Sequence, residues 1–173
     1  MGIPMDKIWN YGSLDVEFAM NVKQKKIKKE PYILVAYHPI ENEDEKQLDE
    51  ALLFFSKKYG IIKIASNSDY GRQYGEEQYN PEDYINLMRN AKVCIGNSSS
   101  LLKEASILEV GVVNIGNRQH KRLKPKNVLD VPCESDKIAL GIEFQLQNKH
   151  QKDLVYYKKD TSKKIIIKLR EII

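Results

Sequence analysis

Short apolar runs alternate with longer amphipathic segments through most of the chain, and this alternation constrains the fold more than any other feature. Runs typical of buried strands cover residues 32–37, 61–65, 92–95, 111–115 and 128–131. Apolar residues at helical spacing fill 43–59, 81–91 and 101–108 between them. Parallel strands need such crossovers, which are right-handed. The pattern therefore predicts an α/β domain, a Rossmann-like open parallel sheet with helices on both faces.

Both ends of the chain fit this pattern less well. Residues 1–30 hold one strand-like piece, 7–13, and the lysine-rich stretch KQKKIKKE. We interpret 1–30 as an interdomain linker or a remnant of a preceding domain, and 31–173 as the Rossmann-like domain. Helices are expected over 134–148 and from Thr161 to the end. The last helix is apolar enough to need a covering surface, either on its own domain or on a partner.

Composition excludes several classes of protein. The 173 residues carry 28 Lys+Arg against 24 Asp+Glu, and a formal charge of +4 does not by itself imply nucleic acid. No stretch approaches the roughly 18–20 apolar residues of a membrane span, and the N-terminus lacks a secretory signal pattern. Two cysteines, Cys94 and Cys133, form no CxxC pair. We expect a cytoplasmic protein without membrane association, bound metal or cofactor.

Polar residues follow four of the predicted strands. His38-Pro39 follows the first, Ser66–Asp69 the second, Gly96–Ser100 the third and Gly116–Gln119 the fourth. Open parallel sheets bind ligands outside the carboxyl ends of their strands. The sequence therefore predicts a binding site on that edge of the sheet.

The turn Gly96-Asn97-Ser98-Ser99-Ser100 lies where a strand leads into a helix. Serine hydroxyls and unpaired N–H groups there can bind phosphate, but serine is also a common helix cap. The basic run 117–127 includes Arg118 and contains no acid, which favours an anion near this turn. A solvated face and a nucleic-acid patch are the alternatives, and the absence of aromatic residues makes nucleic acid the weaker one.

Two further side chains could take part in chemistry at this edge. His38 at a strand end could act as an acid or base, or could be a structural histidine. Glu104 follows Ser100 by about one helical turn. Its carboxylate could accept the two hydroxyls of a ribose, or could be an ordinary surface glutamate.

Several ordered motifs resemble one family. They are AYHP at 36–39, DYINLMRNAKVCIGNSSSLLKEAS at 83–106, GVVNIGNRQ at 111–119 and NVLDV at 127–131. Together they resemble the C-terminal domain of UDP-N-acetylglucosamine 2-epimerases, and KIWNYGSLD at 7–15 is similar to the family's passage between its two domains. The NSSS turn is similar to the hydrolysing branch, which releases UDP and N-acetylmannosamine for sialic-acid-type pathways.

The resemblance implies the C-terminal half of a glycosyltransferase-B-type two-domain fold that binds UDP or UDP-N-acetylglucosamine. It implies that Ser98 and Ser99 hold the diphosphate within the turn Asn97–Ser100, that Arg118 lies near the phosphates, and that Glu104 binds the uridine ribose. His38 matches the family's active-site histidine. Leu101 stands where the family usually has glycine, and Lys121 lies where its pattern also differs.

The resemblance also implies that a whole member is about twice as long, with acid–base carboxylates in the domain that this sequence lacks. We therefore expect a UDP-sugar-binding domain that is incomplete and inactive alone. It would work with a separate N-terminal domain chain or as a homo-oligomer. The alternatives are the donor-binding half of a split glycosyltransferase, or a non-catalytic module that docks a partner through loop 117–127 and the last helix.

Overall fold

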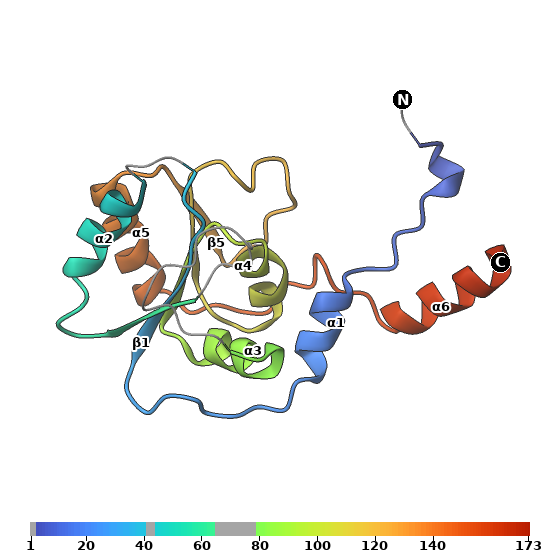
Figure 1. The fold of residues 1–173 in the computed structure, drawn as a ribbon, viewed down its shortest axis with the longest axis horizontal. Helices are drawn as coiled ribbons and strands as arrows, with labels where there is room; N and C mark the ends of the chain where they lie inside the picture. The colour runs from blue at the N-terminus through green and yellow to red at the C-terminus, as the bar shows by residue number, and fades with distance from the viewer. Residues whose placement is uncertain (1–2, 41–43, 65–78) are drawn as a thin grey trace.

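The computed structural model describes residues 3–40, 44–64 and 79–173, which form an open sheet of five parallel strands (Figure 1). The strand order is β2-β1-β3-β4-β5, and every neighbouring pair is parallel. All five strands lie within two residues of the predicted runs, which confirms the Rossmann-like sheet. Their bounds are β1 Tyr32–Ala36, β2 Gly60–Lys63, β3 Val93–Gly96, β4 Val112–Ile115 and β5 Val128–Val131.

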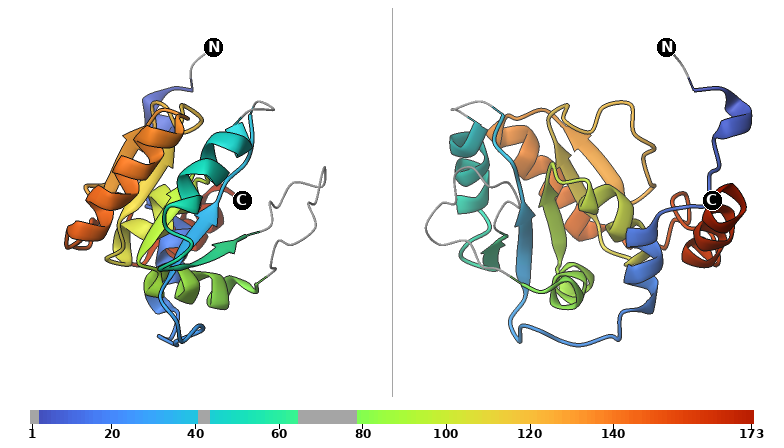
Figure 2. Two further views of the ribbon diagram at one scale, coloured as in Figure 1. Left: turned by 90° about the vertical axis from the view of Figure 1, so that its left-hand side faces the viewer. Right: turned by 45° about the vertical axis from the view of Figure 1, so that its right-hand side comes forward.

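Helices cover both faces of the sheet, as the alternating pattern predicts (Figure 2). Strand β1 shows why, since Ile33 and Val35 pack into one apolar cluster while Leu34 and Ala36 pack into the other. This period-two division is typical of a strand buried on both sides. One cluster holds α2 (Asp44–Leu53) and α5 (Ser135–Gln147), and the other holds α1 (Leu14–Asn21), α3 (Pro81–Asn90), α4 (Ser100–Lys103) and the 3-10 helix η2 (Glu104–Ile107).

Helix boundaries follow local chemistry closely in α3. The Asn80 side chain accepts a hydrogen bond from the Asp83 N–H at 2.8 Å, and Pro81 occupies the first helical position.

Two other predicted helices are shorter than expected. The segment 43–59 is helical only over α2, and 101–108 divides into α4 and η2.

The first thirty residues contain a core element that the sequence did not indicate. Segment 7–13 is not a strand; a 3-10 turn, η1 (Met5–Lys7), precedes it and α1 follows it. Val16 and Ala19 of α1 are fully buried in the core. Helix α1 is thus a core element inside the segment interpreted as an interdomain linker or a remnant of a preceding domain, and the domain boundary at residue 30 stays a prediction.

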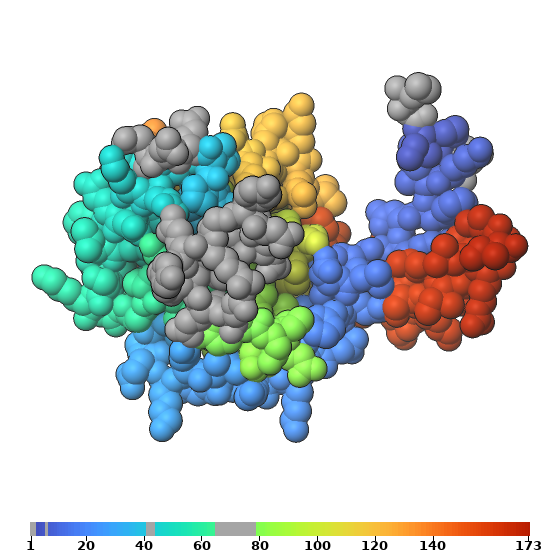
Figure 3. Space-filling view, in the orientation of Figure 1, coloured from blue at the N-terminus to red at the C-terminus, as the bar shows by residue number. Residues whose placement is uncertain are grey.

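Helix α6 (Thr161–Ile172) stands away from the sheet, beside the N-terminal segment (Figure 3). The Thr161 hydroxyl donates to the Tyr11 carbonyl at 2.6 Å, and the Lys168 ammonium lies 4.7 Å from the centroid of the Trp9 ring. Ile167 and Leu169 remain 48% and 51% exposed. We call α6 with residues 3–13 the terminal arm. Its apolar face is largely open rather than packed on its own domain.

The segment Ser66–Asp69, which was predicted to follow the second strand at the binding edge, lies outside the described residues. Within the described part of the chain, no helix has the length and apolar character needed to cross a membrane. The expected cytoplasmic location stays a prediction.

Replacing Gly96 by alanine should destabilise the domain. Gly96 has φ +140°, and an added Cβ would overlap the Ala36 carbonyl oxygen on the neighbouring strand. Backbone strain and overlap together should lower the free energy of unfolding by about 3 kcal/mol or more, measured by urea denaturation. Gly60→Ala is the matched control, because its Cβ would lie 3.6 Å from the nearest atom. Equal effects of the two substitutions would contradict this account.

Candidate functional site

Asn97 ties the end of β3 to the end of β1. Its side chain is fully buried; Oδ1 accepts from the His38 N–H and Nδ2 donates to the His38 carbonyl, both at 2.8 Å. The N–H groups of Asn97 and Ser98 also donate to the Ala36 carbonyl, each at 3.2 Å. Four bonds thus fix the serine turn against the segment that carries His38.

The loop after β4 is held by the same residue. The Asn97 carbonyl accepts from the Arg118 guanidinium at 3.0 Å and from the Gln119 side-chain amide at 2.6 Å. Gln119 is buried, whereas Arg118 is exposed although its guanidinium makes this bond. Sequence reasoning did not single out Gln119; its place inside the GNRQ motif was the available signal. Three loops therefore meet at one buried residue.

The serine hydroxyls are not used as helix caps. Ser99 is the cap residue of α4, yet its side chain makes no capping bond. The Ser98 and Ser100 hydroxyls are 3.0 Å apart, and Ser100 is 2.7 Å from the Tyr84 hydroxyl. Ser100 is thus directed inward, while Ser98 and Ser99 stay half-buried at the surface.

Two nearby residues take up positions that bear on ligand access. Leu101 is fully buried in the core, so the side chain in the family's glycine position points away from the turn. Tyr84 is half-buried, and burial raises the pKa of its phenol well above the usual range. Tyr84 therefore acts at this site as a neutral hydroxyl that holds Ser100.

Glu104 lines a cavity of about 330 Å³ on the same side of the sheet as α3. Its Oε2 is buried and has no hydrogen-bond partner among the described residues. Burial raises the pKa of this carboxyl; Lys103 opposes that shift, and the charge of Asp15 adds to it. Lys103 and Asp15 form an ion pair beside it. The other residues lining the cavity are Leu14, Asp15, Phe18, Pro81, Tyr84 and Ile85.

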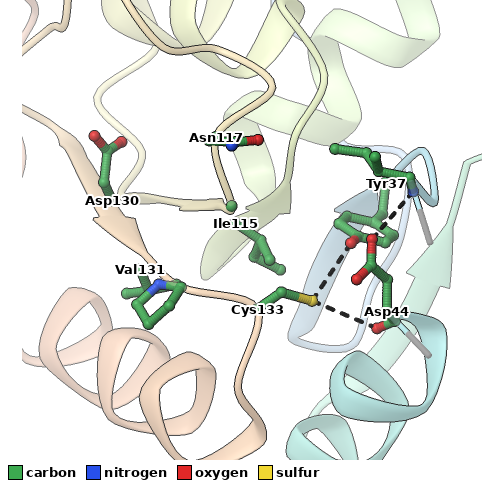
Figure 4. A pocket seen from close by; sticks show the side chains of 10 residues that line it. Tyr37, Asp44, Ile115, Asn117, Asp130, Val131 and Cys133 are labelled. Atoms are coloured by element: carbon green, nitrogen blue, oxygen red, sulfur yellow. Dashed lines mark hydrogen bonds between the residues drawn. The ribbon is translucent and has the colours of Figure 1, made fainter.

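A larger cavity, of about 640 Å³, opens among the ends of β1, β4 and β5 (Figure 4). The Tyr37 hydroxyl lies 3.5 Å from the Cys133 sulfur, and the Asp44 carboxylate accepts from the Ile40 N–H at 3.1 Å. Sequence reasoning did not find this cavity. Its lining comprises Tyr37, Ile40, Asp44, Ile115, Gly116, Asn117, Asp130, Val131, Pro132 and Cys133.

The predicted site residues are brought to this edge of the sheet. Asn97 holds His38 and Arg118 directly, and Tyr84 joins Ser100 to the cavity of Glu104. The remaining cations of 117–127 are exposed, with Lys124 paired to Asp130. Among the described residues, no group of three or more metal-ligating side chains occurs.

Comparison with known proteins decides the family. A sequence model of the UDP-N-acetylglucosamine 2-epimerase family matches residues 1–170. The chain belongs to this epimerase family. The polysialic acid biosynthesis protein P7 of Escherichia coli is 30% identical over 86% of the chain. A UDP-N,N'-diacetylbacillosamine 2-epimerase (hydrolyzing) of Legionella pneumophila is 31% identical over 65% of it.

Solved structures share the fold. The S. aureus MnaA–UDP structure matches 99% of the chain with a TM-score of 0.72 and 10% identity. The Methanocaldococcus jannaschii UDP-GlcNAc 2-epimerase in complex with UDP-GlcNAc and UDP matches 98% with a TM-score of 0.68 and 16% identity. The chain spans 46% and 35% of the E. coli and Legionella relatives, and 55% and 56% of these two structures. This epimerase-family chain is therefore about half as long as the proteins it resembles.

The buried carboxyl of Glu104 should make stability depend on pH. Because its pKa is raised on folding, the folded state binds the proton more tightly, so stability falls as pH rises above the unfolded pKa near 4.3. Glu104→Gln should therefore gain stability relative to the parent protein at pH 7, with a smaller difference at pH 4. Urea denaturation at both pH values measures this.

Glu143→Gln, an exposed position on α5, is the control and should show the same small difference at both pH values. A difference for Glu104→Gln that does not change with pH would contradict the assignment of a raised pKa.

Proposed function

We propose that this chain is the UDP-sugar-binding domain of a hydrolysing UDP-N-acetylglucosamine 2-epimerase. The observation that carries the proposal is the buried Asn97, which brings the serine turn, His38 and Arg118 to one edge of a sheet of this family. The family assignment supports the substrate class, and the geometry supports the contacts. The glycosyltransferase-B-type arrangement, with the sheet forming one half, follows from the same assignment.

The diphosphate would lie on the serine turn. Ser98 and Ser99 offer half-buried hydroxyls that cap no helix, and Arg118 supplies a cation whose position is fixed by the Asn97 carbonyl. Hydrogen bonds to a charged oxyanion are about twice as strong as neutral ones. Asn97 itself has both side-chain polar atoms engaged, so it would serve the ligand through the loops that it holds.

The uridine would lie in the cavity of Glu104. An ionised carboxylate accepts several hydrogen bonds, and the Oε2 atom has no partner among the described residues. Two neighbouring ribose hydroxyls would satisfy it and would offset the cost of its burial. Two structures with a similar fold are complexes with UDP, one of them also with UDP-GlcNAc, which supports this choice of nucleotide.

The reaction would begin with loss of UDP. A base removes the proton at C2 while the C1–oxygen bond breaks, and the bonding pair leaves with UDP; water then adds to the resulting glycal to give N-acetylmannosamine. Negative charge grows on the departing diphosphate, where Arg118 and the serine turn would stabilise it. His38 lies beside the proposed diphosphate position, and we assign it as a catalytic residue of this reaction. The product suits sialic-acid-type biosynthesis, as the name of the E. coli relative suggests.

The terminal arm supports a role for a second domain. The chain is about half as long as its relatives, and α6 presents exposed apolar residues away from the sheet. Its exposed charges include Lys163, Lys164 and Arg170. We propose that the arm docks an α/β domain with an apolar, acidic-edged surface, and that this domain supplies the acid–base carboxylates.

Changing both Ser98 and Ser99 to alanine should weaken UDP binding. Each charge-assisted hydrogen bond is worth roughly 1.5–3 kcal/mol, so losing one bond should raise the dissociation constant about 10- to 100-fold, and losing both should raise it further. Calorimetric titration of UDP at low salt measures the change. Ser56→Ala is the control, because the Ser56 hydroxyl donates to the Leu53 carbonyl at the end of α2. Unchanged affinity in the double variant would remove the diphosphate assignment.

The purified chain should release no N-acetylmannosamine from UDP-N-acetylglucosamine. It should instead bind the N-terminal domain of a full-length family member, and Leu169→Asp in the arm should abolish that binding. Leu140→Asp, at an equally exposed position on α5, is the control. Detectable N-acetylmannosamine from the chain alone would contradict the need for a second domain, and equal loss in both variants would contradict docking at the arm.

Two other functions predict different products. The donor-binding half of a split glycosyltransferase would transfer the sugar to an acceptor rather than release it free. A non-catalytic docking module would use the terminal arm and loop 117–127 without binding UDP. The exposed terminal arm is the feature that most favours the docking module. Titration with UDP distinguishes the docking module from the epimerase, because the docking module would not bind UDP.

A further inference from the structure

The edge of the sheet opposite the candidate site is basic. All five strands are parallel, so they begin at one edge and end at the edge where the candidate site lies. Lysines precede β1, β2 and β3 at the edge where these strands begin. The Gly60 N–H donates to the Pro31 carbonyl at 3.0 Å. The Lys92 N–H donates to the Tyr32 carbonyl at 2.9 Å, so the segments before these strands are held side by side.

The chain between α1 and β1 adds further lysines to this edge and runs along the lower rim of the molecule in Figure 1. It is held against α3, because the Lys25 N–H donates to the Asn86 side chain at 2.9 Å and the Asn90 side chain donates to the Lys25 carbonyl at 3.0 Å. Side chains of this segment project from the rim in Figure 3. We call the exposed lysines of this edge the lysine edge. They are Lys23, Lys25, Lys26, Lys29, Lys57, Lys58 and Lys92.

The lysine edge has few acids to balance it. Segments 23–31 and 54–60 contain one acid, Glu30, against seven lysines and no arginine. Lys25 pairs with Asp83 on α3 at 3.2 Å. Neighbouring like charges repel one another, and an anionic surface would relieve that repulsion. Lysine ammonium groups are hydrated point charges, whereas arginine is preferred for paired contacts to single phosphates, so this composition favours a broad anionic surface.

Two apolar side chains stand beside these lysines at the end of α2. Leu53 and Phe54 are 69% and 73% exposed. Leu52 and Phe55, on either side of the pair, are buried in the core, so the backbone that carries the exposed pair is anchored. The lysine edge continues directly after this turn. Exposed aromatic and aliphatic side chains beside lysines are typical of surfaces that enter the interface of a membrane.

We infer that the lysine edge, together with Leu53 and Phe54, is a peripheral contact surface for an anionic phospholipid membrane. The ammonium groups would lie among the headgroups, and the apolar pair would enter the boundary with the acyl chains. Clusters of about four to eight basic residues are typical of such surfaces. The candidate site, at the opposite edge of the sheet, would remain open to water.

This inference departs from the sequence-based expectation of no membrane association. That expectation rested on the lack of a spanning segment and of a secretory signal, and a peripheral contact requires neither. The inference is independent of the proposed function, because the lysine edge shares no residue with the proposed nucleotide site.

Binding to lipid vesicles tests this surface directly. The chain should bind vesicles of phosphatidylcholine with about 30% phosphatidylglycerol about tenfold or more tightly than vesicles of phosphatidylcholine alone, because the latter carry no net charge. Raising the salt from about 0.05 M to about 0.5 M should weaken this binding about fivefold or more, because salt screens the lysine charges. Sedimentation with the vesicles measures both effects.

Substitutions locate the contact on the chain. Lys57→Glu with Lys58→Glu should weaken binding to the anionic vesicles about tenfold or more. Phe54→Ser should weaken it about fivefold, because the apolar contact is lost without a change of charge. Lys121→Glu with Arg122→Glu, in the exposed loop that Gln119 holds at the candidate site, is the control with the same change in net charge. Denaturation curves show whether each variant is folded at the temperature of the assay.

The outcomes decide between this surface and its alternatives. Binding that is weakened in the lysine and Phe54 variants and retained in the control supports the inference. Equal losses in the lysine variant and the control would indicate attraction by net charge alone and overturn it. Binding to single-stranded RNA without binding to vesicles would assign the lysines to nucleic acid and also overturn it. Titration of UDP is a separate measurement, so failure of the nucleotide site and failure of the membrane contact are distinguishable.

Discussion

The buried side chain of Asn97 is the interaction on which the candidate site depends. Its side-chain amide joins the loops after β1 and β3 through two hydrogen bonds of 2.8 Å. The backbone carbonyl of Asn97 accepts two hydrogen bonds from the loop after β4. Parallel strands bring their carboxyl ends to one edge but leave the following loops free to diverge. The Asn97 side-chain amide both donates to and accepts from His38, so a single side chain fixes these loops at little cost in conformational entropy. Gly96 makes this possible, because no other residue fits so close to Ala36.

Charge is divided along this edge in a way that suits a ligand with unlike parts. Arg118 is held against the serine turn by the Asn97 carbonyl, while carboxylates occur in the cavities on either side. Among these carboxylates, Glu104 is disfavoured by its burial, because burying its charge lowers the stability of the protein without a ligand. Such a cost is typical of a residue positioned for a ligand, because a hydroxyl-bearing partner would satisfy the unpaired oxygen.

The sequence predicted the sheet, and the polar residues that gather at its carboxyl edge, better than the helices and cavities. Strands buried on both faces appear as continuous apolar runs, and residues that directly follow them are placed by topology alone. Helix α1 was not predicted because only Val16 and Ala19 are buried on it, and two residues are too few to show a helical periodicity. The Tyr84–Ser100 contact and the 640 Å³ cavity join residues far apart in the chain, and their meeting depends on packing that no local pattern encodes.

The two apolar clusters bear on what a second domain would contribute. Each face of the sheet has its own buried core, one with α2 and α5 and the other with α1, α3, α4 and η2. The terminal arm adds little to either, since Thr161 is the one residue of α6 that is buried in the described structure. Both faces of the sheet are therefore covered without the arm, and the arm's open apolar face is available for association. A docking domain would then not be required for the fold, so the proposed binding of UDP and the proposed turnover can be tested separately.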